Sequence, residues 1–131
     1  MKVIRFAGVA LALALAACGM VGIGTGIYAV DKPVPAATQS AGAYQVEAYI
    51  NQALTTKSWR ADKVRPGEIR ATLEWDNKVA VVTILYSAQR YSIALHSSLN
   101  LDERNGSISN EYNIRLKQLE SEIDRRMKPT G

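Results

Sequence analysis

The only cysteine of this 131-residue chain, Cys18, is the side chain whose type and setting most clearly suggest chemistry. It ends the run Leu15-Ala16-Ala17-Cys18, in which two small residues precede the thiol. A thiol can act as a nucleophile, bind a metal, form a disulfide or accept an acyl group. An intramolecular disulfide and a cysteine-based zinc site both need further cysteines, which the sequence lacks. Covalent modification of Cys18 is therefore the chemistry to consider first.

The other reactive side chains do not form a recognisable catalytic or metal-binding pattern. His96 is the only histidine, and zinc sites usually take several His or Cys ligands. Asp102 and Glu103 lie between Asn100 and Asn105, but this loop lacks the spacing of a twelve-residue calcium-binding loop. No phosphate-binding, zinc-protease or nucleophile-elbow motif is present. The sequence predicts no enzyme, no metal site and no cofactor.

The segment before Cys18 has the three parts of a secretory signal. Lys2 and Arg5 form a basic start, residues 6–15 are uncharged and apolar, and small residues follow. This arrangement resembles the lipobox of bacterial lipoproteins, in which the cysteine sulfur receives a lipid group before cleavage. The resemblance implies a signal peptide over residues 1–17 and a mature chain held in the membrane by fatty-acyl chains on Cys18. In lipoproteins of Gram-negative bacteria, an Asp directly after the cysteine commonly signals retention in the inner membrane. This chain has Gly19 there, so the resemblance implies the outer membrane, with the protein facing the periplasm. The inner membrane is the alternative.

An uncleaved membrane anchor is an alternative explanation of the same leader. Residues 6–30 contain no charged side chain, and a membrane-spanning helix needs about 20 apolar residues. The glycines at positions 19, 22, 24 and 26 argue against a helix, since each costs roughly 1 kcal/mol relative to alanine. Membrane helices tolerate glycine better than soluble ones do, so both explanations stay open.

Composition limits the partners and the organisation of the remaining chain. Loss of Lys2 and Arg5 with the leader lowers the formal net charge from +4 to +2. Charges of both signs are interspersed, which excludes the basic block typical of nucleic-acid binding. Residues 31–43 are rich in Pro, Ala, Ser and Gly and lack apolar periodicity, so residues 18–43 are predicted to be a lipidated N-terminus with a flexible tether. Residues 44–128 then form one small domain.

Apolar spacing predicts the elements of this domain. Residues 44–57 and 109–128 each place apolar side chains three and four positions apart, which is typical of amphipathic helices. Residues 68–75, 79–86 and 90–97 alternate apolar and polar side chains, which is typical of strands. The predicted fold is α+β in the order α-β-β-β-α. It is a three-stranded antiparallel meander with both helices packed on one face.

The hairpin loops predict the register of the strands and the composition of the uncovered face. Loops at residues 77–78 and 88–89 would pair Leu73 with Val82 and Ile84 with Ile93, and both hairpins then place their large apolar residues on one face. The other face would carry a solvent-exposed apolar stripe with charged neighbours. This candidate interaction surface consists of Val79, Val81, Leu85, Arg70, Arg90 and His96. Alternatively, long arginine stems or the tether cover the stripe.

Short motifs spread over residues 44–124 resemble those of small uncharacterised lipoproteins of Proteobacteria. They are Ser58-Trp59, Pro66-Gly67-x-Ile69-x-Ala71, Tyr86-Ser87, Tyr91-Ser92-Ile93, Ser98-Leu99-Asn100-Leu101 and Glu111-Tyr112-Asn113. The resemblance implies the fold and an envelope location and assigns no catalytic residue. We therefore expect a non-enzymatic, lipid-anchored envelope protein that contacts another envelope protein, a second copy of itself or the cell wall. The alternatives are a ligand-binding or hydrolytic domain using residues 96–105, and a single-pass membrane protein.

Overall fold

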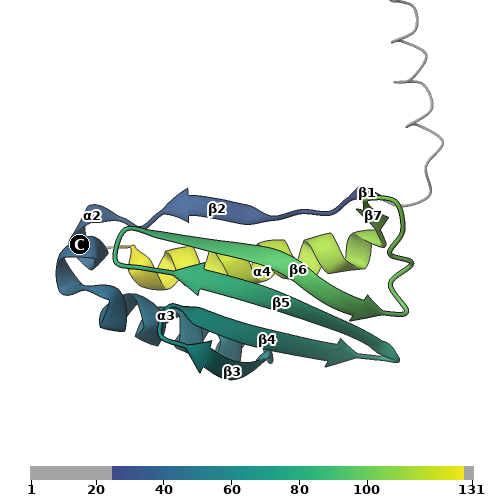
Figure 1. Ribbon diagram of the computed structural model, residues 1–131, viewed down its shortest axis with the longest axis horizontal. Helices are drawn as coiled ribbons and strands as arrows, with labels where there is room; N and C mark the ends of the chain where they lie inside the picture. Colours follow the sequence, from purple (N-terminus) through teal and green to yellow (C-terminus); the bar gives the residue numbers. More distant parts are fainter. Residues whose placement is uncertain (1–24, 129–131) are drawn as a thin grey trace, which may run out of the picture.

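The computed structural model describes residues 25–128, which form an antiparallel sheet of five strands with helices on one face (Figure 1). The helices are α2 (Ala36–Ala41), α3 (Ala43–Thr56) and α4 (Asn110–Met127). The strands are β1 (Thr25–Gly26), β2 (Val30–Pro33), β3 (Arg60–Arg65), β4 (Glu68–Trp75), β5 (Lys78–Tyr86), β6 (Arg90–Leu99) and β7 (Ser107–Ile108). The sheet has the order β2-β6-β5-β4-β3, while β1 and β7 pair separately. The α+β class is confirmed, and the predicted meander is the centre of a larger sheet.

The core lies between the sheet and the two long helices, α3 and α4. On β5, Ala80, Val82 and Ile84 are fully buried, because the helices cover the face to which they point. The apolar stripe of each amphipathic helix contributes to this core, as Ile50 of α3 and Leu116 of α4 show. Figure 1 shows both helices behind the sheet, with the opposite sheet face turned to the reader. The prediction that both helices cover the same face is correct.

The predicted register is right for one hairpin and wrong for the other. Ile84 pairs with Ile93 between β5 and β6, as expected. Leu73, however, pairs with Ala80 and not with Val82. The loop consists of Asp76 and Asn77, and Asp76 adopts a positive φ of 53° that Asp tolerates. A shift of two residues leaves the side chains of β4 and β5 on their predicted faces.

The tether predicted for residues 31–43 is wrong, because this segment forms β2 and α2 of the domain. Residues from Val30 to Pro33 pair with β6 and add an edge strand to the sheet. Val30 and Val34 are 4 % and 2 % exposed, so they belong to the core. Proline is compatible with an edge strand, because it has no N–H to donate and the outer side of an edge strand needs no donor. The folded domain therefore begins before residue 44.

Strand β3, residues 60–65, is a further strand that the predicted three-stranded meander does not include. All six residues of β3 are exposed, so no alternation marks them as a strand. The strand pairs with β4 and has an irregularity in register between Lys63 and Arg65. Such bulges and charged side chains are typical of exposed sheet edges, where they hinder pairing with other chains.

The final helix, α4, matches its prediction closely. Ser109 is its N-cap and accepts a hydrogen bond from the backbone N–H of Glu111 at 3.4 Å. Arg125 and Arg126 lie in the last turn, where the helix dipole favours cations. Among residues 25–128, no helix is both long and apolar enough to span a bilayer. The predicted signal peptide and Cys18 lie outside the described residues.

Candidate functional site

The sheet face opposite the helices, hereafter the open face, carries the apolar stripe that the alternation predicts. Along β5 the side chains of Val79, Val81 and Thr83 are half-buried, and Leu85 is 50 % exposed. Their neighbours along the strand point into the core, because successive side chains of a strand point to opposite faces. A contiguous row of partly exposed apolar side chains, unlike a single one, is a common feature of interaction surfaces.

A bulge in β6 adds Leu99 to this stripe. Val81 pairs with Ser97 while Val82 pairs with Leu95, so His96 is an extra residue in the ladder. Beyond the bulge Leu99 pairs with Val79 and points to the open face, where it is 57 % exposed. Leu99 is not among the surface residues predicted from the sequence. Ser97 is the available signal, because a polar residue stands there at a position that the regular alternation assigns to the core.

Charged side chains surround the stripe and pair with one another. Arg90 Nη2 lies 3.0 Å from Asp31 Oδ1, and Arg70 Nη2 lies 3.5 Å from Glu68 Oε2. The other pairs on this face are Arg65–Glu68, Arg60–Asp62 and Arg60–Glu74. Exposed ion pairs of this kind contribute only about 0–1 kcal/mol each to stability. Their main effect is that each arginine of the open face has an acidic neighbour within its own chain.

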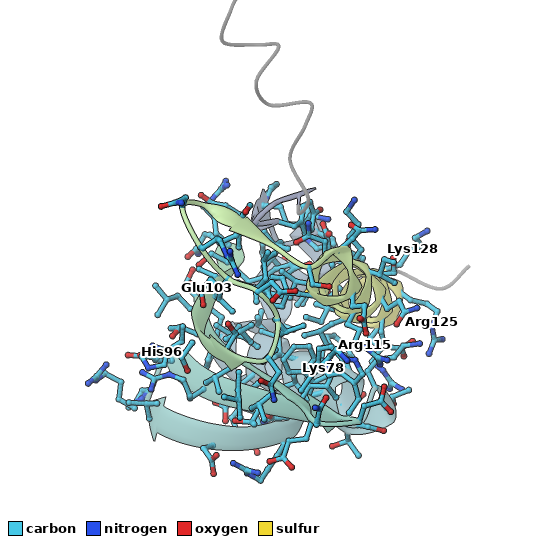
Figure 2. All side chains as sticks on the ribbon, turned by 90° about the vertical axis from the view of Figure 1, so that its right-hand side faces the viewer. Lys78, His96, Glu103, Arg115, Arg125 and Lys128 are labelled. Atoms are coloured by element: carbon cyan, nitrogen blue, oxygen red, sulfur yellow. The ribbon has the colours of Figure 1, made fainter. Side chains whose placement is uncertain are left out.

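Arg70 and His96 meet near the centre of the open face. Arg70 Nη1 lies 3.5 Å from His96 Nε2, and since arginine can only donate, this nitrogen of the imidazole accepts. The Nε–H of Arg70 is buried and makes no hydrogen bond within the described residues. Figure 2 shows His96 on the side of the domain opposite α4. The two predicted residues are therefore close together, although nothing around them resembles a catalytic pair.

The six predicted surface residues share the open face, with different exposures. Leu85, Arg90 and His96 are exposed, while the other three are half-buried: Val79, Val81 and Arg70. A shallow depression of about 260 Å³ lies at the end of the face near Leu85 and Arg90. Its volume is below the range of about 300–1,000 Å³ that is usual for small-molecule sites. The open face is thus better suited to a flat partner than to an enclosed ligand.

The residues of the alternative ligand site, 96–105, are not brought together. His96 contacts Arg70, Asp102 lies 4.0 Å from Arg104, and Glu103 accepts a hydrogen bond from Ser98 at 2.7 Å. Each of these three side chains thus faces a different neighbour. In residues 25–128 no three His, Cys, Asp or Glu side chains are grouped so that they could hold a metal ion.

A cluster of polar side chains, absent from the predicted sites, links β2 and residues just before it to α4. Lys32 Nζ lies 2.5 Å from Glu120 and 2.6 Å from Asp124. Tyr28 donates to Glu120 at 2.5 Å, and Tyr91 of β6 donates to Asp124 at 2.7 Å. Burial lowers the pKa of Lys32, but its hydrogen bonds to Asp124 and Glu120 outweigh that effect and raise the pKa. Burial and the bond to Asp124 raise the pKa of Tyr91. These groups are all paired, so the cluster fastens elements together.

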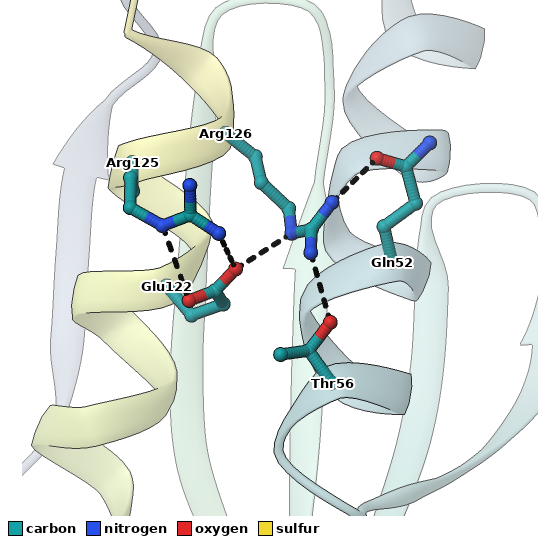
Figure 3. A network of polar contacts seen from close by, with 5 residues as sticks. All are labelled: Gln52, Thr56, Glu122, Arg125 and Arg126. Carbon is teal, nitrogen blue, oxygen red and sulfur yellow. Dashed lines mark hydrogen bonds and ion pairs between the residues drawn. The ribbon is translucent and has the colours of Figure 1, made fainter.

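A second polar network joins α3 to α4 (Figure 3). Glu122 accepts from Arg126 Nε at 2.8 Å and from Arg125 Nη2 at 2.5 Å. Arg126 also donates to Gln52 at 3.0 Å and to Thr56 at 2.8 Å, both on α3. Hydrogen bonds from Arg125 lower the pKa of Glu122. Partial desolvation acts in the opposite direction, but the hydrogen bonds from Arg126 also lower this pKa. This network fixes the relative position of the two long helices.

Comparison with protein-family models, with curated proteins and with solved structures gives no match for this chain. The comparisons therefore assign no enzymatic activity and no relative. The geometry of the open face and the sequence before residue 25 are what remains to support a function.

Proposed function

We propose that this protein is a non-enzymatic, lipid-anchored protein of the bacterial cell envelope, attached through Cys18. Its small α+β domain faces the periplasm, with the outer membrane as the favoured location. The open face of the sheet is its contact surface for a protein or the cell wall. We also propose, from the short motifs, that the chain is related to small uncharacterised lipoproteins of Proteobacteria.

The observation that carries the proposal is an exposed apolar stripe on a domain that starts very soon after the lipobox. The described fold begins at Thr25, so only residues 19–24 separate it from Cys18. At no more than about 3.6 Å per residue, this stretch spans at most about 25 Å. A domain held so close to a membrane meets neighbouring envelope components constantly, and Leu85 and Leu99 offer them apolar surface.

Metabolic labelling with a fatty-acid analogue tests the anchor. We expect label on the wild-type chain, no label on Cys18→Ser, and a shift of that variant out of the membrane fraction or into an unprocessed precursor. Inhibition of the lipoprotein signal peptidase should also leave the wild-type precursor uncleaved. Equal membrane retention of Cys18→Ser together with an intact Met1 in the wild-type mass would instead establish an uncleaved anchor.

Substitution of Leu85 by lysine tests the contact surface. We expect Leu85→Lys to reproduce the phenotype of a deletion, because it places a charge at the most exposed apolar side chain of β5. Ile114→Lys is a matched control, since Ile114 of α4 is 48 % exposed and lies away from the open face. Asp102→Ala should retain wild-type function, because Asp102 lies in the loop after β6 and outside the open face. A deletion phenotype in Asp102→Ala, with Leu85→Lys unaffected, would support the ligand-binding alternative.

A further inference from the structure

We infer that the open face binds a second copy of this chain, with the two sheets stacked across a two-fold axis that runs along β5. This inference deepens the proposed function, because it names the partner of the open face. It rests on the role proposed for that face and is independent of the acylation of Cys18.

The open face has the anatomy and the size of a small protein interface. Its centre is the apolar stripe, its flanks are small or β-branched side chains such as Thr72, Ser92 and Ala94, and its rim is charged. Five strands of four to ten residues, about 4.8 Å apart, give about 600 Å² of sheet. Two such faces bury roughly 1,200 Å², the lower end of the range for stable specific interfaces.

The charges of the open face alternate in sign from strand to strand. The open face of β2 carries Asp31, and that of β6 carries Arg90. β5, the middle strand, has no charge on this face. On its other side, β4 carries Glu68, Arg70 and Glu74. The edge strand β3 carries Arg60, Asp62 and Arg65. The net charges in sheet order are therefore −1, +1, 0, −1 and +1.

A two-fold axis along β5 stacks strands of opposite charge. Such an axis places β6 of one copy over β4 of the other, and β2 over β3, because β5 is the middle strand of the five. Each of these pairs combines +1 with −1. An axis across the strands would instead stack every strand on itself and oppose like charges. The charge pattern thus selects one of the two simple symmetric arrangements.

One row of residues across the sheet illustrates this self-complementarity. The register places Asp31, Ser92, Leu85, Glu68 and Arg65 at the same level along the five strands. Rotation about β5 reverses the row, so Leu85 meets Leu85 of the second copy. Asp31 then meets Arg65 of the second copy, and the converse pair forms at the opposite edge.

The position of β1 is compatible with two copies in one membrane. β1 lies at one end of the strands, beside β7, and not on the open face (Figure 1). Rotation about an axis along the strands keeps this end on the same side in both copies. Both chains then enter the dimer from one direction, and confinement to a membrane raises their effective concentration.

The residue types of the open face favour protein over glycan as the partner. Sugar rings commonly stack on aromatic side chains, and the open-face positions of β4, β5 and β6 carry no Trp, Tyr or Phe. Trp75, Tyr86 and Tyr91 all point to the helix side. Aliphatic side chains bordered by small residues are suited to close sheet-on-sheet packing at about 10 Å.

Cross-linking of the full chain in intact cells tests the dimer. Leu85→Cys should give a homodimer with a short bismaleimide, because the axis brings residue 85 of both copies together. Ile114→Cys is the matched control at similar exposure, and the unsubstituted chain reports any background from Cys18. Equal cross-linking at positions 85 and 114, no homodimer at 85, or an adduct only with another protein would each overturn the inference.

A charge exchange provides a second, independent test. In the Leu85→Cys background, Asp31→Arg and Arg65→Asp should each reduce the homodimer yield about two- to fivefold, since a rim pair contributes little energy. The double variant should recover it, because the opposed charges are restored. Failure of the double variant to recover would contradict the stated axis. A homodimer without acyl label on Cys18 would contradict only the proposed anchor. Acyl label on Cys18 without a homodimer would contradict only the proposed dimer.

Discussion

Glu122 shows how a single side chain holds the two long helices in place. Its carboxylate is nearly enclosed, at 8 % exposure, and accepts hydrogen bonds from Arg125 and Arg126. Arg126 in turn donates to Gln52 and Thr56 of α3. Loss of the charge on Glu122 would therefore affect the contact between α3 and α4 as well as the last turn of α4.

We predict that lowering the pH decreases the thermal stability of the domain, because Glu122 becomes protonated. Hydrogen bonds from Arg125 hold the pKa of Glu122 below its value in the unfolded chain, which is about 4.3. The stabilisation is present above that pH and is lost as the pH falls through the lower folded pKa. Melting curves between pH 6 and pH 3 should therefore show a steeper decline for the wild type than for Glu122→Gln. Parallel declines for the two proteins would contradict this role.

At the same scale, the residues of the open face were largely predictable, and Leu99 was not. Alternation along β5 fixes the faces of Val81 and Leu85, even though the first hairpin register was wrong by two residues. The bulge at His96 reverses the alternation locally, and its cause lies in the pairing of β6 with β5. Such a change depends on the partner strand, so the sequence of one strand does not reveal it.

The segment before α3 shows at the scale of elements what local sequence does not reveal. β2 has four residues and ends in proline, so it carries almost no periodic signal. Its place in the sheet comes from distant partners, namely β6 and the carboxylates of α4 that bind Lys32. β3 is missed for a different reason, since a fully exposed edge strand has no buried side chains to alternate.

Asn113 fastens the start of the described chain to α4. Its Oδ1 accepts from the backbone N–H of Tyr28 at 2.9 Å, and its Nδ2 donates to the carbonyl of Gly26 at 2.7 Å. Since Asn113 is only 6 % exposed, these bonds are shielded from water. They tie the end of the domain nearest Cys18 to its longest helix.

We predict that Asn113→Ala destabilises the domain by about 1–3 kcal/mol, because it leaves shielded backbone groups of Gly26 and Tyr28 without this partner. The Tyr28 amide should also exchange with solvent faster than in the wild type, as hydrogen exchange can measure. Asn113→Asp is the matched control, since it keeps the acceptor for Tyr28 and removes the donor to Gly26. Unchanged protection of Tyr28 in Asn113→Ala would show that the contact contributes nothing.

At the scale of the whole molecule, the structure shortens the segment that would link the domain to the proposed anchor. The sequence predicts a lipidated N-terminus and tether over residues 18–43, whereas the described fold already begins at Thr25, which leaves only residues 19–24 between it and Cys18. At most about 25 Å would then separate a lipid on Cys18 from Thr25. The strands run from the β1–β7 end to the loop at residues 87–89, a length of about 30 Å for nine or ten residues. With Cys18 acylated as proposed, one end of the domain would therefore stay near the bilayer, and the other end would not.

Quenching by spin-labelled lipids should reveal this orientation in the acylated protein. Glu103 lies in the loop between β6 and β7, at the end of the domain that faces the reader in Figure 2, and Ala88 lies in the loop at the opposite end of β6. A fluorophore on Glu103→Cys should be quenched several times more strongly than one on Ala88→Cys. Acylation of Cys18 leaves each variant a single reactive thiol, so the two signals are directly comparable. Equal quenching would mean that the domain tumbles at its anchor or lies flat on the membrane. Stronger quenching at position 88 would mean that the loop at residues 87–89 lies nearer the bilayer than the β1–β7 end. That result would contradict the distance limit of about 25 Å between Cys18 and Thr25.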